Sequence, residues 1–267
     1  MSSRTKLSRN AAMLVCSVAL AGCVGVPVEE LLASTAIVAE LQRENGALVE
    51  AARFSAGRAG QAPPGGWDPF IVSPFSTRTE YRLVESDLSV VLEANAAGSA
   101  SGFYRRIRID PTRYPVLEWR WRVLQPLASA DPRVPSRADS AARLVISFHG
   151  DVTRLDFVER TTLRLYKALS GEVLPYAMLM YIWSSGAPVG TIAPNNYTDK
   201  IQMIVVDSGS DRIGEWHEFR RNVLEDYRLA FGEEPWDIVA VGVMTDADKT
   251  RQKARAQYGD ITFRPAQ

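Results

Sequence analysis

Charged side chains at alternating positions are the first residues in this sequence that could do chemistry. Residues 117–123 and 143–149 each alternate apolar and polar side chains, as strands do when one face is buried. If both strands lie in one sheet, their polar faces form a charged surface on which planar arginine donors and carboxylate acceptors can bind sugars and uronic acids. A solvated face with cross-strand ion pairs is the alternative. The residues of this predicted face are Glu118, Arg120, Arg122, Arg143, Ser147 and His149.

A second candidate binding region is the polar loop at 184–200, which follows a strongly apolar strand. Trp183 stands at the junction, where its ring can stack on a sugar, although a place at the edge of the core explains it equally well. Asn195 and Asn196 offer hydrogen bonds, and Tyr197 offers a stacking plane. Long loops between strands often carry function, so we expect ligand contacts here.

A third candidate is a pair of carboxylates, Asp246 and Asp248, in the stretch Thr-Asp-Ala-Asp-Lys-Thr. Oxygen ligands of this kind suit Ca²⁺, but the stretch lacks the glycine and the terminal glutamate of an EF-hand loop. A structural Ca²⁺ is one hypothesis for these residues and an ordinary turn is the other. No other cofactor is expected.

Several classes of function are disfavoured by what the sequence lacks. The two histidines cannot form a multi-histidine metal centre, and there is no Gly-x-Ser-x-Gly elbow or glycine-rich phosphate loop. Lysine plus arginine equals aspartate plus glutamate, at 31 each, so no basic excess attracts nucleic acid. No catalytic residue is assigned, although an acid and a base from distant segments remain open.

The N-terminus has the pattern of a secretion signal. Arg4, Lys6 and Arg9 precede the apolar residues 11–22. The stretch Leu20-Ala21-Gly22-Cys23 resembles the lipobox of bacterial lipoproteins, which implies cleavage before Cys23, acylation of that cysteine and attachment to a membrane. An uncleaved anchor or a buried helix is the alternative. Residue 24 is valine rather than aspartate, which by the same resemblance favours the outer membrane without deciding which side the domain faces.

After the anchor the sequence divides into a tether and a main domain. Residues 27–57 are rich in alanine and glutamate with apolar residues at helical spacing, which predicts a helical tether. A glycine- and proline-rich break at 57–66 follows. We therefore expect a signal peptide at 1–22, a lipidated helical tether and linker at 23–66, and a folded domain at 67–267.

Short strands dominate the predicted domain, and the elements do not alternate regularly between strand and helix. This pattern favours a jelly-roll-like antiparallel β-sandwich with two or three accessory helices. Helices are expected at 156–169 and 217–231, the second ending at Gly232. Strands are expected at 79–83, 88–94, 103–109, 117–123, 143–149, 176–183, 201–206, 238–244 and 258–263.

Four stretches carry a resemblance to a known bacterial family, at 114–123, 181–191, 218–227 and 241–248. They include Leu-Glu-Trp-Arg-Trp-Arg-Val and Val-Gly-Val-Met-Thr-Asp-Ala-Asp. The chain from about residue 67 to 263 resembles the domain-of-unknown-function family 3047. The resemblance implies a fold similar to jelly-roll carbohydrate-binding or galactose-binding-like modules. It implies no catalytic residues, because the family has no established activity.

The sequence thus favours a lipid-anchored envelope protein that binds a glycan or another envelope component without catalysis. One alternative is an envelope polysaccharide hydrolase or lyase that uses His149, Tyr197 or a carboxylate as acid and base. The other alternative is a structural or assembly lipoprotein that contacts a protein partner.

Overall fold

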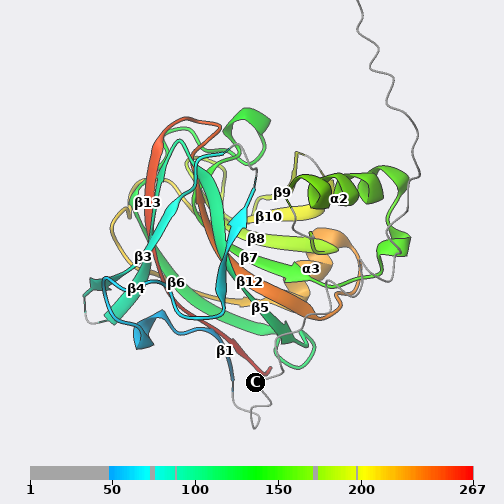
Figure 1. Cartoon of the computed structure of the whole chain (residues 1–267), viewed down its shortest axis with the longest axis horizontal. Coiled ribbons are helices and arrows are strands. Elements are labelled where there is room, and N and C mark those ends of the chain that lie inside the picture. Colours follow the sequence, from blue (N-terminus) through cyan, green and yellow to red (C-terminus); the bar gives the residue numbers. More distant parts are fainter. Residues whose placement is uncertain (1–47, 73–75, 88, 171–173, 197, 267) are drawn as a thin grey trace, which may run out of the picture.

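A computed structural model describes residues 48–72, 76–87, 89–170, 174–196 and 198–266. The predicted signal, Cys23 and the tether as far as residue 47 lie outside these residues. The described chain folds into two β-sheets packed face to face, with two α-helices at one side (Figure 1). The predicted mainly β sandwich with accessory helices is confirmed. No helix within these residues is both long enough and apolar enough to cross a membrane.

Sheet A is antiparallel throughout and has the order β11-β6-β13-β4-β3, with β1 paired to the far part of β13. The long central strand β13 therefore ties the C-terminal end of the chain to three neighbours. The strands are β1 (Val49–Ala52), β3 (Glu80–Ser86), β4 (Ser89–Ala97), β6 (Val116–Gln125), β11 (His217–Asn222) and β13 (Lys253–Arg264).

Sheet B has the order β2-β5-β12-β7-β8-β10-β9. Its pairs are antiparallel except β8 with β10, which run parallel, so the sheet is mixed. The strands are β2 (Trp67–Ile71), β5 (Ala100–Ile109), β7 (Ser140–Phe148), β8 (Ala177–Ser184), β9 (Ile192–Asn195), β10 (Thr198–Ser208) and β12 (Ile238–Asp246). Short 3₁₀ turns are η1 (Phe54–Ala56), η2 (Pro135–Arg137) and η3 (Val152–Arg154).

The main core lies between the sheets and follows the alternation of the strands. On β6, Leu117, Trp119, Trp121 and Val123 are all buried, as their parity predicts. Leu144, Ile146 and Phe148 on β7 face them from the other sheet and are fully buried. Each such side chain stabilises the fold by about 1.5–3 kcal/mol through removal of apolar surface from water.

The folded domain begins earlier than the sequence suggests. Val49–Ala52 forms strand β1 and pairs with β13, so this part of the predicted helical tether is a strand and the domain includes it. Phe54 is fully buried and packs against Trp67, with ring centroids 5.1 Å apart.

Helix α2 (Phe157–Ser170) confirms the first predicted helix, and a capping box begins it: Asp156 accepts from the Glu159 amide while Glu159 accepts from the Asp156 amide. The second prediction is wrong in its first part. Residues 217–222 are strand β11, and only Val223–Phe231 is helix α3. Asn222 caps α3, because its side-chain oxygen accepts from the amides of Leu224 and Glu225.

Candidate functional site

The predicted charged face is divided between the two sheets. Glu118, Arg120 and Arg122 lie on β6 in sheet A, whereas Arg143 lies on β7 in sheet B and His149 follows that strand. The prediction of one shared surface is therefore wrong. Alternation identified which side chains point away from the main core, but it could not show which strands become neighbours.

On sheet A the charged side chains already contact one another. Glu118 accepts from Arg220 and Arg264, and the guanidinium groups of Arg120 and Arg122 lie 4.6 and 5.0 Å from the Trp216 ring. This is the cross-strand ion-pair arrangement that was the alternative to a ligand-binding face.

Glu93, on the same face of sheet A, belongs to this charge network. Burial opposes its ionisation, but hydrogen bonds from Arg82, Gln257 and Asn95 outweigh that effect and lower its pKa to about 2. Glu93 is therefore ionised at every ordinary pH, and its role here is to hold the charged face together.

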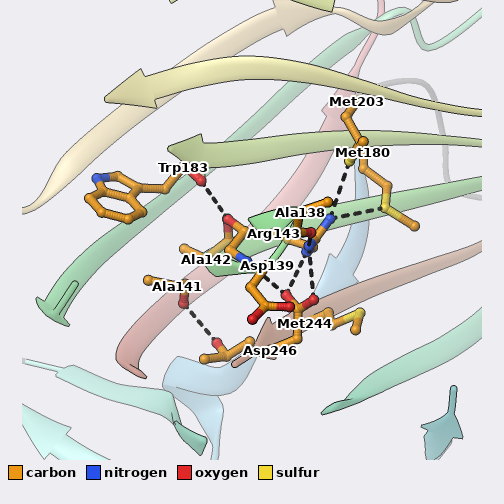
Figure 2. Close-up of polar contacts among 12 residues, drawn as sticks. Ala138, Asp139, Ala141, Ala142, Arg143, Met180, Trp183, Met203, Met244 and Asp246 are labelled. Carbon is orange, nitrogen blue, oxygen red and sulfur yellow. Dashed lines mark hydrogen bonds and ion pairs between the residues drawn. The ribbon is translucent and has the colours of Figure 1, made fainter. Parts of the chain in front are cut away.

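Arg143 on sheet B is buried, contrary to the prediction that it faces solvent (Figure 2). It donates to both carboxylate oxygens of Asp246, at 2.7 and 2.9 Å, and also to the carbonyl of Ala138. Its guanidinium lies 3.4 Å from the sulfur of Met203. The segment that carries Ala138 thus covers this part of the outer face of sheet B, and the ion pair lies beneath it.

Asp246 and Asp248 meet Asp139, and one carboxylate oxygen of each lies within 4.8 Å of the others. Both oxygens of Asp246 are already bonded to Arg143, and Asp139 accepts from the amide and hydroxyl of Thr250. Ca²⁺ requires six to eight oxygen ligands, so these residues do not fit a calcium cage unless Arg143 moves away. Burial and the neighbouring Asp139 carboxylate raise the pKa of Asp248, which favours a proton at this position.

The remaining predicted residues do not form one site. His149 packs against Trp236, with ring centroids 5.3 Å apart. Asn195 and Asn196 line a groove of about 310 Å³ beneath α2, together with Lys200 and Tyr176. Trp183 is only 2% exposed and lies elsewhere, and Tyr197 lies outside the described residues.

The group of residues best suited to binding or catalysis lines a cavity at the open edge of the sandwich, which we call the edge cavity. It has a volume of about 380 Å³ and lies where β10 of sheet B approaches β11 of sheet A. Its apolar lining includes Trp183, Val123 and Phe219. Its polar lining includes Asp207, Ser208, Asp211, Arg212, His217 and Glu218.

Asp207 and His217 form the centre of the edge cavity. The Nδ1 atom of His217 lies 2.8 Å from a carboxylate oxygen of Asp207, and the indole of Trp121 donates to the same oxygen at 3.1 Å. Both side chains are nearly buried, at 12% and 11% exposed. The carboxylate of Asp207 favours the tautomer with its proton on Nδ1, in which the lone pair of a neutral imidazole lies on Nε2.

Nε2 of His217 is buried and has no hydrogen-bond partner within the part of the chain that the structure describes. A buried polar atom without a partner costs about 1–3 kcal/mol, so such atoms usually meet a water or a ligand. In this conformation Nε2 itself is not exposed to the cavity, so the imidazole must move before it can accept a hydrogen bond, or a proton, from a molecule there.

Sequence reasoning missed the Asp207–His217 pair. The helix predicted at 217–231 would place His217 on a helix, and the strand predicted at 201–206 ends before Asp207. The two are ten positions apart in the chain but come from different sheets. The only local signal was that His217 is one of two histidines, next to the apolar Trp216 and Phe219.

Solved structures with similar folds include several that act on or bind polysaccharides. The xyloglucanase domain of NopAA, an effector of Sinorhizobium fredii, is 8% identical, with 78% of this chain and 96% of that chain covered and a TM-score of 0.40. Endoglucanase 3 of Trichoderma harzianum, from family GH12, is 7% identical, with 84% and 100% covered and a TM-score of 0.39. A family 29 carbohydrate-binding module in complex with mannohexaose is 8% identical, with 82% and 89% covered and a TM-score of 0.32.

At these identities and scores the likeness carries no argument about function. No curated protein matches the chain in sequence. A family, however, matches most of its length and confirms the resemblance that the four sequence stretches indicated. Over residues 65–262 the match is to the family described as protein of unknown function (DUF3047), and the chain belongs to that family.

Proposed function

We propose that this protein is a lipid-anchored component of the cell envelope that binds a glycan in the edge cavity. The observation that carries the proposal is the buried, unpartnered Nε2 atom of His217, a residue that lines a cavity together with both apolar and polar side chains. The cavity volume of about 380 Å³ lies within the range of small-molecule sites, about 300–1,000 Å³.

The composition of the edge cavity suits a sugar. A sugar ring presents apolar C–H faces and hydroxyl groups, which correspond to the half-buried ring of Phe219 and to the acceptors at Asp207 and His217. Among the described residues, three carboxylates, of Asp207, Asp211 and Glu218, line the cavity, whereas Arg212 is its one arginine and is already paired with Glu215. The cavity therefore favours neutral or amino sugars, and uronic acids are disfavoured.

The test is a binding measurement with the full chain purified in detergent, against soluble polysaccharides, peptidoglycan fragments and lipopolysaccharide. We expect saturable binding to one class and a loss of about tenfold in His217→Gln, because a buried ligand donor that loses its acceptor costs about 1–3 kcal/mol. His149→Gln is the matched control, since it changes the other histidine away from the cavity. Equal affinity in all three proteins would exclude this site.

A second candidate function follows from the same pair. A histidine whose Nδ1 is held by a carboxylate is the arrangement that general bases use, so a polysaccharide hydrolase or lyase with His217 as proton acceptor is the enzyme alternative. Prolonged incubation in the binding assay would release soluble fragments, and His217→Gln would abolish the release. Absence of both binding and product would favour the protein-partner alternative.

The anchor is part of the proposal and has its own test. Mass spectrometry of the protein extracted from membranes should find Cys23 as an acylated N-terminus. Cys23→Ser should remove the acyl mass and move the protein to the soluble periplasmic fraction. Retention of residues 1–22 in the mature chain would contradict the lipoprotein assignment. Fractionation of the two membranes would then show whether the outer membrane holds it, as Val24 suggests.

A further inference from the structure

Helix α2 has an apolar stripe that faces solvent. Phe157, Val158 and Leu165 are 75%, 69% and 58% exposed. Their spacing of one, seven and eight residues places them within about a quarter of the helix circumference. A different side of the helix is used for attachment, since Leu163 packs against the main core. Figure 1 shows α2 at the margin of sheet B, outside the two-sheet body.

Basic side chains lie beside this stripe. Arg160, Arg164 and Lys167 follow at intervals of four and three residues, so they share one side of the helix. Arg160 and Arg164 are exposed, and Lys167 is half-buried. Glu159 is the only acidic residue within α2. The helix therefore carries a local positive charge in a chain whose acidic and basic residues balance overall.

We propose that α2 lies on the surface of an anionic membrane, with Phe157, Val158 and Leu165 among the acyl chains and the basic side at the headgroups. A basic helix with a separate apolar stripe binds in the interfacial plane, where arginine and lysine stems extend to the phosphates. The charge complementarity selects anionic lipid over another protein surface. A protein partner would also need about 800 Å² of matched area, and α2 presents a narrow convex stripe.

This inference does not rest on the edge cavity. It adds a second membrane contact to the acyl anchor expected at Cys23, and two such signals bind a membrane more stably than one. It also orients the domain, because α2 projects from the margin of sheet B and would hold that side toward the lipid.

The test is hydrogen exchange of the full chain bound to vesicles of phosphatidylcholine, with or without phosphatidylglycerol. We expect the amides of α2 to exchange several-fold more slowly on vesicles that contain phosphatidylglycerol, and high salt should reverse the effect. The amides of α3 should not change. No slowing of α2 on either kind of vesicle overturns the proposal. So does slowing that rises with protein concentration without lipid, which would indicate a second copy of the chain.

Two variants separate the charge from the apolar stripe. Arg160→Gln with Arg164→Gln should lower the partition of α2 onto the anionic surface roughly 25-fold, since each basic residue there contributes about a fivefold change. Phe157→Ser with Leu165→Ser should abolish the slowed exchange. Leu229→Ser is the matched control, because Leu229 on α3 is 71% exposed and apolar. Slowing that persists in both double variants overturns the assignment to α2.

Discussion

The buried ion pair between Arg143 and Asp246 allows a prediction whose size follows from its surroundings. The two side chains are 4% and 7% exposed. Arg143→Met removes both donors to Asp246 and leaves its carboxylate with one hydrogen bond, from the amide of Ser140 at 3.0 Å. Removing one partner of a buried pair costs about 3–5 kcal/mol, because the remaining charge stays in a medium of low dielectric constant.

The double variant Arg143→Met, Asp246→Leu should recover most of this loss. Methionine suits the site, because Met180 and Met203 already line it (Figure 2). With no charge left to desolvate, we expect its free energy of unfolding to lie within about 1–2 kcal/mol of the wild type. The two single changes would then show a coupling energy of several kcal/mol, which is expected only for groups in contact.

Urea unfolding followed by tryptophan fluorescence measures these differences in the free energy of unfolding. A change in stability shifts the urea concentration at the midpoint and leaves the dependence of the free energy on urea unchanged. For a domain of this size, Arg143→Met should lower Tm by about 6–20 °C. Two results would refute the reasoning. One is a single variant that unfolds within about 1 kcal/mol of the wild type. The other is a double variant destabilised by the sum of the single changes, which would show that packing rather than charge is lost.

Three further predictions concern other charged or capping groups. The pKa of Glu93 is lowered to about 2, so ionised Glu93 contributes to the free energy of unfolding above its ordinary pKa, and this contribution is lost as pH falls from about 4.5 to 2. Because its partner arginines are exposed, the contribution should be about 2 kcal/mol. The acid unfolding of Glu93→Gln should lack it. Burial and Asp139 raise the pKa of Asp248, so its ionised form destabilises the fold at neutral pH. Asp248→Asn should therefore raise Tm at pH 7, but not below the pKa that an aspartate has in the unfolded chain. A rise in the wild-type Tm on adding Ca²⁺ would reveal a cation site instead. Asn222→Ala should cost about 1 kcal/mol, measured by urea unfolding, and Asn222→Ser should restore most of it if the cap is the cause.

Strands with a clear alternation or a mainly apolar run could be predicted from the sequence, and those with neither could not. Leu117, Trp119, Trp121 and Val123 show the period of two that a half-buried strand requires, and β6 lies there. Strand β9 is four residues long and contains Pro194, so its sequence resembles a turn. Strand β11 lies within a stretch that predicts a helix, because Phe219 on the strand and Tyr227 on the following helix happen to fall at helical spacing.

The candidate site was beyond sequence reasoning for a different reason. Asp207 and His217 meet because β10 and β11 are edge-side strands of opposite sheets, and strand order is not encoded in local periodicity. Arg143 was misplaced for a related reason. Its parity correctly placed it away from the main core, but the segment around Ala138 returns over that face and buries it. Parity distinguishes the two faces of a sheet without showing which of them meets water.

Strand β1 determines how mechanical force enters the domain. Val49 pairs with Phe263, Glu50 with Thr262 and Ala52 with Ile261, so the first strand of the described chain is attached beside the last. If Cys23 is acylated, any pull between the membrane and a bound polymer passes through this joint. A force along a strand loads its cross-strand hydrogen bonds together in shear rather than one at a time. Under tension, four residues of sheet would then be the first part of the domain to yield.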